Sequence, residues 1–138
     1  MAASSDGWKP YTIGTFGENN ELSGLNVGDK VYMRAVAAGN SRMGTSGRNY
    51  HRFVMTGRIA ASGNINTLLN PDPNADVSLE GKDSCYYYLF HECTSLTSAP
   101  ELPATTLARS CYNSMFYKCT SLTTTPKLPA TTLADYCY

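Results

Sequence analysis

Apolar positions recur at a spacing of 26 residues over the last third of the chain. The stretch from Cys93 reads CTSLTSAPELPATTLARSCYNSMFYK, and the stretch from Cys119 reads CTSLTTTPKLPATTLADYCY. Residues 84–93 match residues 110–119 at the same offset, so a third and more divergent unit precedes the two clear ones. A period in the twenties is typical of leucine-rich-repeat solenoids, in which each unit supplies one short strand and one helical or 3₁₀ return segment.

Each unit of this repeat combines an extended part with a return part. The pattern predicts a strand near 96–99, which Pro100 and Pro103 end, and a helical or 3₁₀ return segment over 107–116. Repeats of this kind stack on one continuous core, which requires apolar side chains at equivalent positions. The side chains expected to point inward are Leu96, Leu102, Leu107, Met115 and Phe116, with Leu122, Leu128 and Leu133 as apolar counterparts one unit later.

Charged residues at equivalent positions change sign from one unit to the next. Stacked units would therefore place opposite charges side by side, although an exposed pair contributes only about 0.2–1 kcal/mol. The alternation indicates the register of stacking, and coincidental drift of surface charges is the alternative. The three series are Glu92 with Lys118, Glu101 with Lys127, and Asp83 with Arg109 and Asp135.

The first 57 residues or so lack the repeat and carry strand and turn signals instead. A turn at 28–30 precedes a strand at 31–36, whose alternation places Val31, Met33 and Ala35 on one face. A second strand is predicted over 50–56, and residues 38–47 have the composition of a flexible loop. Trp8, Tyr11 and Ile13 predict a further short strand.

The predicted fold class is therefore mainly β, with two parts. Residues 1–58 form a small N-terminal β-sheet or sandwich-like module that is incomplete, because so few strands bury too little surface to be stable alone. Residues 59–138 form a short leucine-rich-repeat solenoid with 26-residue coils and a truncated last coil. Residues 67–69 take the place of residues 94–96 in an atypical first coil, at an offset of 27.

Charge and hydropathy narrow the range of partners. Lysine and arginine together number 11, as do aspartate and glutamate, so no net field attracts nucleic acid or anionic lipid. No apolar run approaches the roughly 18–20 residues needed to span a bilayer, which argues against membrane insertion. The first residues lack the basic and apolar regions of a secretory signal, so either the signal was removed or none is needed.

Five cysteines are spaced by alternating gaps of 8 and 18 residues, and the odd number excludes a complete internal disulfide framework. No pair has the close spacing of a zinc hook, so no metal site is predicted. Stacked units would place Cys93 beside Cys119, and Cys85 beside Cys111 and Cys137. We expect two columns of buried thiols, with oxidation between stacked sulfurs as the alternative.

Catalytic constellations are not visible in the sequence. Neither His51 nor His91 stands in a motif that would make it the base for a serine or cysteine nucleophile. Carboxylates occur singly on the repeat surfaces, and the glycine-rich stretch at 39–47 lacks a phosphate-loop lysine. The chain is predicted to be a non-enzyme without catalytic residues or cofactors.

Several motifs resemble one known family. They are Met-Phe-x-x-Cys-Thr-Ser-Leu-Thr at 115–123, the Leu-Pro-Ala-Thr-Thr-Leu box at Leu102 and Leu128, the segment 53–65, and the front pieces 6–12 and 28–32. Together they resemble the BspA-like leucine-rich-repeat surface proteins of host-associated anaerobic bacteria, with the β module that precedes their repeats. The resemblance implies an exported protein, extracellular or at the cell surface, that binds host or microbial ligands and has no catalytic residues to carry over. The chain departs from the family pattern before Trp8, where earlier strands are missing, and at Tyr138, where the last coil stops.

The expected function is a binding or adhesion module that recognises a protein or glycan partner through its solenoid face. Tyrosines are the candidate contact surface, because aromatic residues are enriched at interfaces; the alternative is that several of them pack between coils. An uncapped last coil would expose core leucines, which predicts self-association, docking through the open ends, or a longer parent protein. A structural fibre or decoration component of a bacteriophage virion is the alternative function. The candidate contact residues are Tyr86, Tyr87, Tyr88, Tyr112 and Tyr117.

Overall fold

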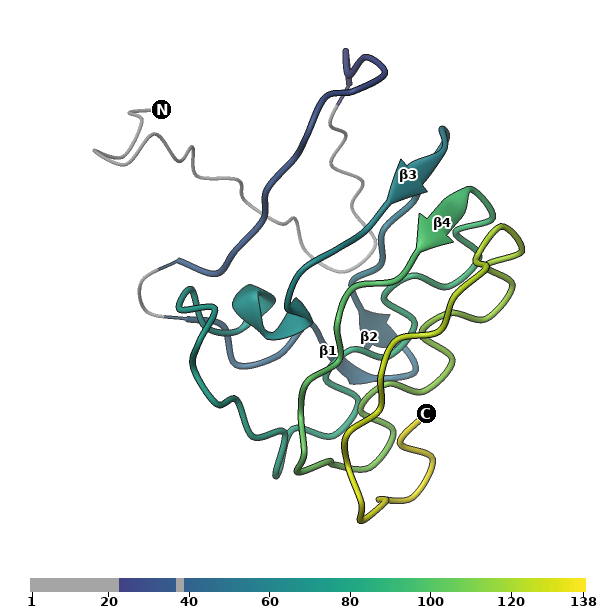
Figure 1. The fold of residues 1–138 in the computed structure, drawn as a ribbon. Helices are drawn as coiled ribbons and strands as arrows, with labels where there is room; N and C mark the ends of the chain where they lie inside the picture. Colours follow the sequence, from purple (N-terminus) through teal and green to yellow (C-terminus); the bar gives the residue numbers. More distant parts are fainter. Residues whose placement is uncertain (1–22, 37–38) are drawn as a thin grey trace.

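The structure is a computed structural model that describes residues 23–36 and 39–138, so the strand expected around Trp8, Tyr11 and Ile13 lies outside the described residues. Helix is almost absent from the described part, which consists of short strands joined by turns (Figure 1). In chain order the elements are β1 (Gly44–Ser46), β2 (Asn49–Tyr50), β3 (Ile59–Ala60), the 3₁₀ helix η1 (Ile65–Leu68) and β4 (Leu96–Ser98).

Two small sheets organise these strands. Strands β1 and β2 pair antiparallel, whereas β3 and β4 pair in parallel, with Ile59 opposite Leu96. The parallel neighbours are thus 37 residues apart, because η1 and a long connection lie between them. The expected equivalence of residues 67–69 with residues 94–96 is wrong. Thr67 lies in η1, whose start is capped by the Asn64 side chain accepting from the Asn66 N–H.

The return parts of the repeats are runs of consecutive turns, here named the first turn ribbon (residues 82–93) and the second turn ribbon (residues 108–119). Odd-numbered N–H groups donate three residues back, as Leu89 does to the Tyr86 carbonyl at 3.2 Å. Even-numbered N–H groups over residues 84–92, and those of Ser110 and Tyr112, donate to the following repeat, as Phe90 does to the Met115 carbonyl at 3.0 Å. The two ribbons therefore lie side by side along their length (Figure 1). The prediction of a helical or 3₁₀ return segment over 107–116 is therefore wrong, because this range consists mainly of consecutive turns.

Left-handed backbone at every fourth residue explains why these segments do not become helices. A residue with a side chain in this conformation costs roughly 1–2 kcal/mol, and it interrupts the right-handed progression of an α-helix. The interruption turns two consecutive side chains of every four inward, as at Cys85 with Tyr86 and Leu89 with Phe90. The non-glycine residues with positive φ are Ser84, Tyr88, Glu92, Ser110, Ser114, Lys118 and Tyr136.

One hydrophobic core runs through the repeats and under the front of the chain. The expected inward positions Leu96, Leu102 and Met115 are fully buried. Leu107, Phe116 and Leu122 are half-buried against the same core, whereas Leu128 and Leu133 are exposed. Met43, Phe53 and Met55 from the front of the chain also pack on this core.

The front of the chain departs from its predicted strands. Residues 31–36 form no strand, and Val31 is exposed, so the alternating pattern does not mark a buried face there. Ala35 alone of that set is buried, and its N–H donates to the Thr67 carbonyl at 2.7 Å. Of the strand expected over 50–56 only Tyr50 is in a strand, and the segment expected to be a flexible loop contains β1.

Besides the β1–β2 pairing, the front of the chain is hydrogen-bonded to the first turn ribbon. The Met43 N–H donates to the Cys85 carbonyl at 3.0 Å, and the Phe53 N–H donates to the Leu89 carbonyl at 2.7 Å. The Phe53 ring also stacks on Phe90, with ring centroids 5.1 Å apart. The front of the chain thereby covers the edge of the first turn ribbon and places β1 and β2 beside it.

Candidate binding surface

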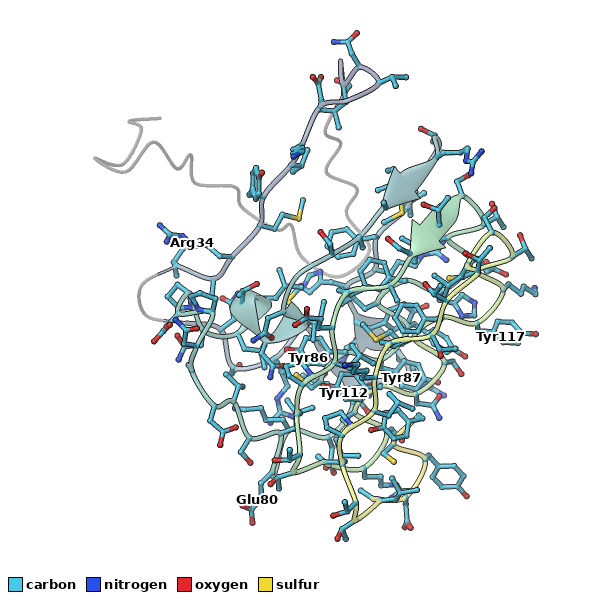
Figure 2. The ribbon with its side chains drawn as sticks, in the orientation of Figure 1. Arg34, Glu80, Tyr86, Tyr87, Tyr112 and Tyr117 are labelled. Atoms are coloured by element: carbon cyan, nitrogen blue, oxygen red, sulfur yellow. The ribbon has the colours of Figure 1, made fainter. Side chains whose placement is uncertain are left out.

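The five candidate tyrosines divide into an inward and an outward set. Tyr86 and Tyr112 are 0% and 2% exposed, so the expectation that their side chains belong to a contact surface is wrong. Their rings stack with centroids 5.4 Å apart and an interplanar angle of 3°, because both residues lie at equivalent inward-facing positions of the two turn ribbons. Figure 2 shows both rings within the body of the protein, whereas Tyr117 projects outward.

The two inward tyrosines differ in their hydrogen bonds. The Tyr86 hydroxyl donates to Oδ1 of the buried Asn66 at 3.0 Å. The Tyr112 hydroxyl is also buried but has no hydrogen-bond partner within the described part of the chain. Burial raises the pKa of both phenols well above the usual range, so both remain neutral and have a structural role.

The outward rings form a contiguous set, here named the aromatic row: Tyr50, Tyr87, Tyr88, His91 and Tyr117. Tyr87 and Tyr88 lie 4.2 Å apart between ring centroids, and Tyr50 meets the Tyr88 ring edge-on at 5.2 Å. His91 stacks between Tyr88 at 4.1 Å and Tyr117 at 5.1 Å. The row therefore runs from β2 across the first turn ribbon to the second.

Two members of the aromatic row were not among the sequence candidates. His91 stands one repeat before Tyr117, so the 26-residue offset was a signal that could have found it. Tyr50 lies outside the repeat and reaches the row only because β2 packs beside the first turn ribbon. No sequence signal marked that position.

Charged side chains border the row at its Tyr117 end. Lys118 Nζ lies 2.9 Å from Glu92 Oε1, and Arg52 approaches the same carboxylate at 3.7 Å. The hydrogen bond from Lys118 lowers the pKa of Glu92, and the same bond raises the pKa of Lys118. This pair confirms one predicted series of opposite charges. Over residues 23–36 and 39–138 the other two series form no ion pair, and Arg109 lies 5.9 Å from the centre of the Tyr136 ring instead.

Beside Tyr87 lies an open cavity of about 310 Å³, here named the serine hollow. Strand β1 with the turn after it, the first turn ribbon and the start of the second turn ribbon each contribute one wall. Gly47 lets the turn after β1 lie close to Tyr87, since a Cβ at position 47 would lie 3.1 Å from the Tyr87 hydroxyl oxygen. Tyr87 belongs both to the hollow and to the aromatic row. The lining residues are Thr45, Ser46, Gly47, Asp83, Ser84, Tyr87, Arg109 and Ser110.

The Tyr87 phenol belongs to both the row and the hollow, and its protonation state is set by its neighbours. A hydrogen bond with the Tyr88 side chain, with a smaller contribution from burial, raises the pKa of Tyr87 to about 12. Tyr87 therefore presents an uncharged hydroxyl to the hollow near neutral pH.

The five cysteines are buried and free. The Cys93 thiol donates to the Phe53 carbonyl at 3.2 Å, and the Cys119 thiol donates to the Phe90 carbonyl at 3.0 Å. Burial raises the pKa of Cys85, Cys93 and Cys111 to about 11, which opposes formation of a nucleophilic thiolate. These thiols act as packing groups.

Within the described ranges, no group of three or more histidine, cysteine, aspartate or glutamate side chains is placed to hold a metal ion. No helix found in those ranges has both the length and the apolarity that a bilayer crossing requires. In comparisons with known proteins, no family model, curated protein or solved structure matches the chain.

Proposed function

We propose that the chain is a non-enzymatic binding or adhesion module, built as a short leucine-rich-repeat-like solenoid, that recognises a protein or glycan partner through the aromatic row. Backbone hydrogen bonds between residues 84–92 and 109–117 support stacking of successive repeats, and so does the stacking of Tyr86 on Tyr112. The ion pair between Glu92 and Lys118 supports the 26-residue register.

The observation that carries the proposal is a contiguous set of outward aromatic rings centred on the first turn ribbon, which backbone hydrogen bonds join to the front of the chain on one side and to the second turn ribbon on the other. Tyr117 is 53% exposed, and its neighbours in the row are half-buried, so one edge of each ring is available to a partner. Rigid aromatic rings supply contact area at low cost in conformational entropy, which is why they dominate binding energy at protein interfaces. An extracellular or cell-surface location, as the BspA-like resemblance implies, belongs to the same proposal.

The test is a binding screen of the whole chain against immobilised extracellular-matrix proteins and glycans, read by surface plasmon resonance. Tyr117→Ala and Tyr87→Ala should each weaken the binding found by about thirtyfold, the equivalent of a hot-spot loss of about 2 kcal/mol. Tyr32→Ala is the matched control, since Tyr32 is 70% exposed outside the row. Thermal melts of all three variants establish that they fold. Equal binding by all of them would exclude the aromatic row as the contact surface.

A virion fibre or decoration component is the second candidate, supported by apolar side chains exposed on the last repeat. Leu128, Leu133 and Tyr136 are all exposed there, and exposed apolar patches often mark contacts between subunits. Light scattering over a hundredfold range of protein concentration tests this candidate. Ordered assemblies that Leu133→Lys abolishes would support it, and a constant monomer mass would contradict it.

A further inference from the structure

Resting on the proposed binding function, we infer that the serine hollow is the receptor site for one end of a neutral glycan, with the aromatic row carrying the following sugar rings. The inference names both the ligand class and the place of contact, which the proposed function leaves open between protein and glycan. Its starting point is that Tyr87 is shared by the hollow and the row.

The hollow offers the groups that a sugar needs. Hydroxyls of Thr45, Ser46, Ser84, Ser110 and Tyr87 both donate and accept hydrogen bonds, as sugar hydroxyls do. A sugar ring has an edge of hydroxyls and a face of C–H groups, so it matches a polar wall beside an aromatic ring. An apolar peptide side chain would desolvate hydroxyls such as those of Ser84 and Ser110 without offering them a hydrogen bond, at a cost in binding energy.

The charges in the hollow favour a neutral ligand. Asp83 and Arg109 both line it, so the hollow contains one negative and one positive group. Within the described ranges they form no ion pair with each other or with any other residue, and both retain hydrogen-bonding capacity for a ligand. A carboxylate accepts bonds from two neighbouring hydroxyls, and a guanidinium donates to hydroxyl or ring oxygens. An acidic sugar would meet the Asp83 carboxylate as well as the Arg109 guanidinium, so the hollow carries no net charge that would favour it over a neutral sugar.

The walls are fixed before any ligand binds. Ser46 Oγ accepts hydrogen bonds from the N–H groups of Arg48 and Asn49, each at 3.2 Å. The Ser84 N–H donates to the Arg109 carbonyl at 2.9 Å, which joins the two ribbons where both residues line the hollow. Preorganisation of this kind lowers the entropy cost of binding a small polar ligand. The volume of about 310 Å³ is at the low end of the roughly 300–1,000 Å³ of small-molecule sites, which suits a terminal sugar.

Two pairs of matched variants test the site. Ser110→Asn places a larger side chain in the hollow, and Ser114→Asn makes the same change one turn further along, outside it. Both serines have left-handed backbone, with φ of 55° and 51°, which asparagine tolerates. Asp83→Asn removes the carboxylate from the hollow, and Asp135→Asn makes the same charge change at the equivalent position two repeats later, outside the hollow.

The assay is a glycan array followed by saturation-transfer NMR on the whole chain, with neutral oligosaccharides of glucose, galactose, mannose and N-acetylglucosamine and with sialylated and sulfated ones. We expect binding to at least one neutral oligosaccharide, a loss of tenfold or more in Ser110→Asn and Asp83→Asn, and unchanged affinity in Ser114→Asn and Asp135→Asn.

Several results would overturn the inference. Binding only to charged glycans contradicts the neutral ligand, and equal affinity in all four variants contradicts the hollow as the site. A protein ligand lost in Tyr117→Ala, without any glycan binding, overturns the inference and leaves the proposed function standing. Absence of every protein and glycan ligand overturns both.

Discussion

The buried hydroxyls of Tyr86 and Tyr112 allow a test in which the same substitution should have opposite effects at equivalent positions. Tyr86→Phe removes the donor to Asn66 Oδ1, and the Asn66 side chain is only 3% exposed. An acceptor left unpaired in that environment costs about 1–3 kcal/mol. Tyr112→Phe removes a buried hydroxyl that has no partner among the described residues, so it abolishes a desolvation cost of similar size.

We therefore expect Tyr86→Phe to lower the free energy of unfolding by about 1–3 kcal/mol. Tyr112→Phe should leave it unchanged or raise it by about 1 kcal/mol, because ring stacking on Tyr86 is retained. For a chain of 138 residues, each kcal/mol corresponds to about 3–5 °C in Tm. The two variants should then melt at clearly different temperatures, and the Tyr112→Phe variant should be the more stable of the two.

Urea unfolding followed by circular dichroism at pH 7 measures the difference, and an unchanged urea dependence (m-value) shows that only stability has changed. Both phenols are neutral at that pH, since burial raises the pKa of each. If Tyr112→Phe proved as destabilising as Tyr86→Phe, the assignment of one paired and one unpaired hydroxyl would be refuted.

Three further predictions follow from the same geometry. Lys118→Ala should raise the pKa of Glu92 toward its ordinary value, measured as the midpoint of its side-chain carboxyl ¹³C shift, and an unchanged midpoint would contradict the ion pair. Burial raises the pKa of Cys85 from 9.0 to about 11, so the folded state retains a proton that the unfolded chain loses. The urea midpoint should therefore be flat below about pH 9 and fall between about pH 9 and 11; a rise there would refute the buried thiol. Gly44→Ala should destabilise the protein by about 1–3 kcal/mol, because its Cβ would lie 2.8 Å from a carbonyl of the first turn ribbon. Gly57→Ala, with open space at its Cβ, should remain within about 0.5 kcal/mol of the parent in the same melts, and equal losses would contradict the contact.

The register of the repeats was predictable because identical letters recur at a fixed offset. The repeat aligns Cys93 with Cys119 and Glu92 with Lys118, and the ion pair confirms the second alignment. The conformation of the return segments was not predictable in the same way. Apolar residues spaced by four suit an α-helix as well as a turn ribbon, and serine or lysine gives no sign of left-handed backbone as glycine would.

The candidate surface was only partly predictable for a related reason. The tyrosines at 86, 87 and 88 are adjacent in sequence, and only the phase of the turns decides which of them face the core. The walls of the serine hollow that come from β1, and the ring of Tyr50, lie outside the repeat. Their places depend on pairing between the front of the chain and the first turn ribbon, which no local pattern encodes.

The alternation of hydrogen bonds gives the turn ribbons a strict parity. Over residues 84–92, even-numbered N–H groups bond across to the next repeat and odd-numbered ones bond along the chain. Insertion of a single residue there would exchange the two kinds of hydrogen bond over the rest of the ribbon. The same insertion would shift the inward-facing and outward-facing positions by one residue, so Tyr87 and Tyr88 would no longer both face the solvent. A one-residue shift has a similar effect in a β-strand, where it exchanges the two faces. Only insertions in multiples of four would preserve both the bonding and the faces. Insertions and deletions among natural variants of such a chain should accordingly occur in the proline-rich half of each unit, which does not depend on this alternation of hydrogen bonds.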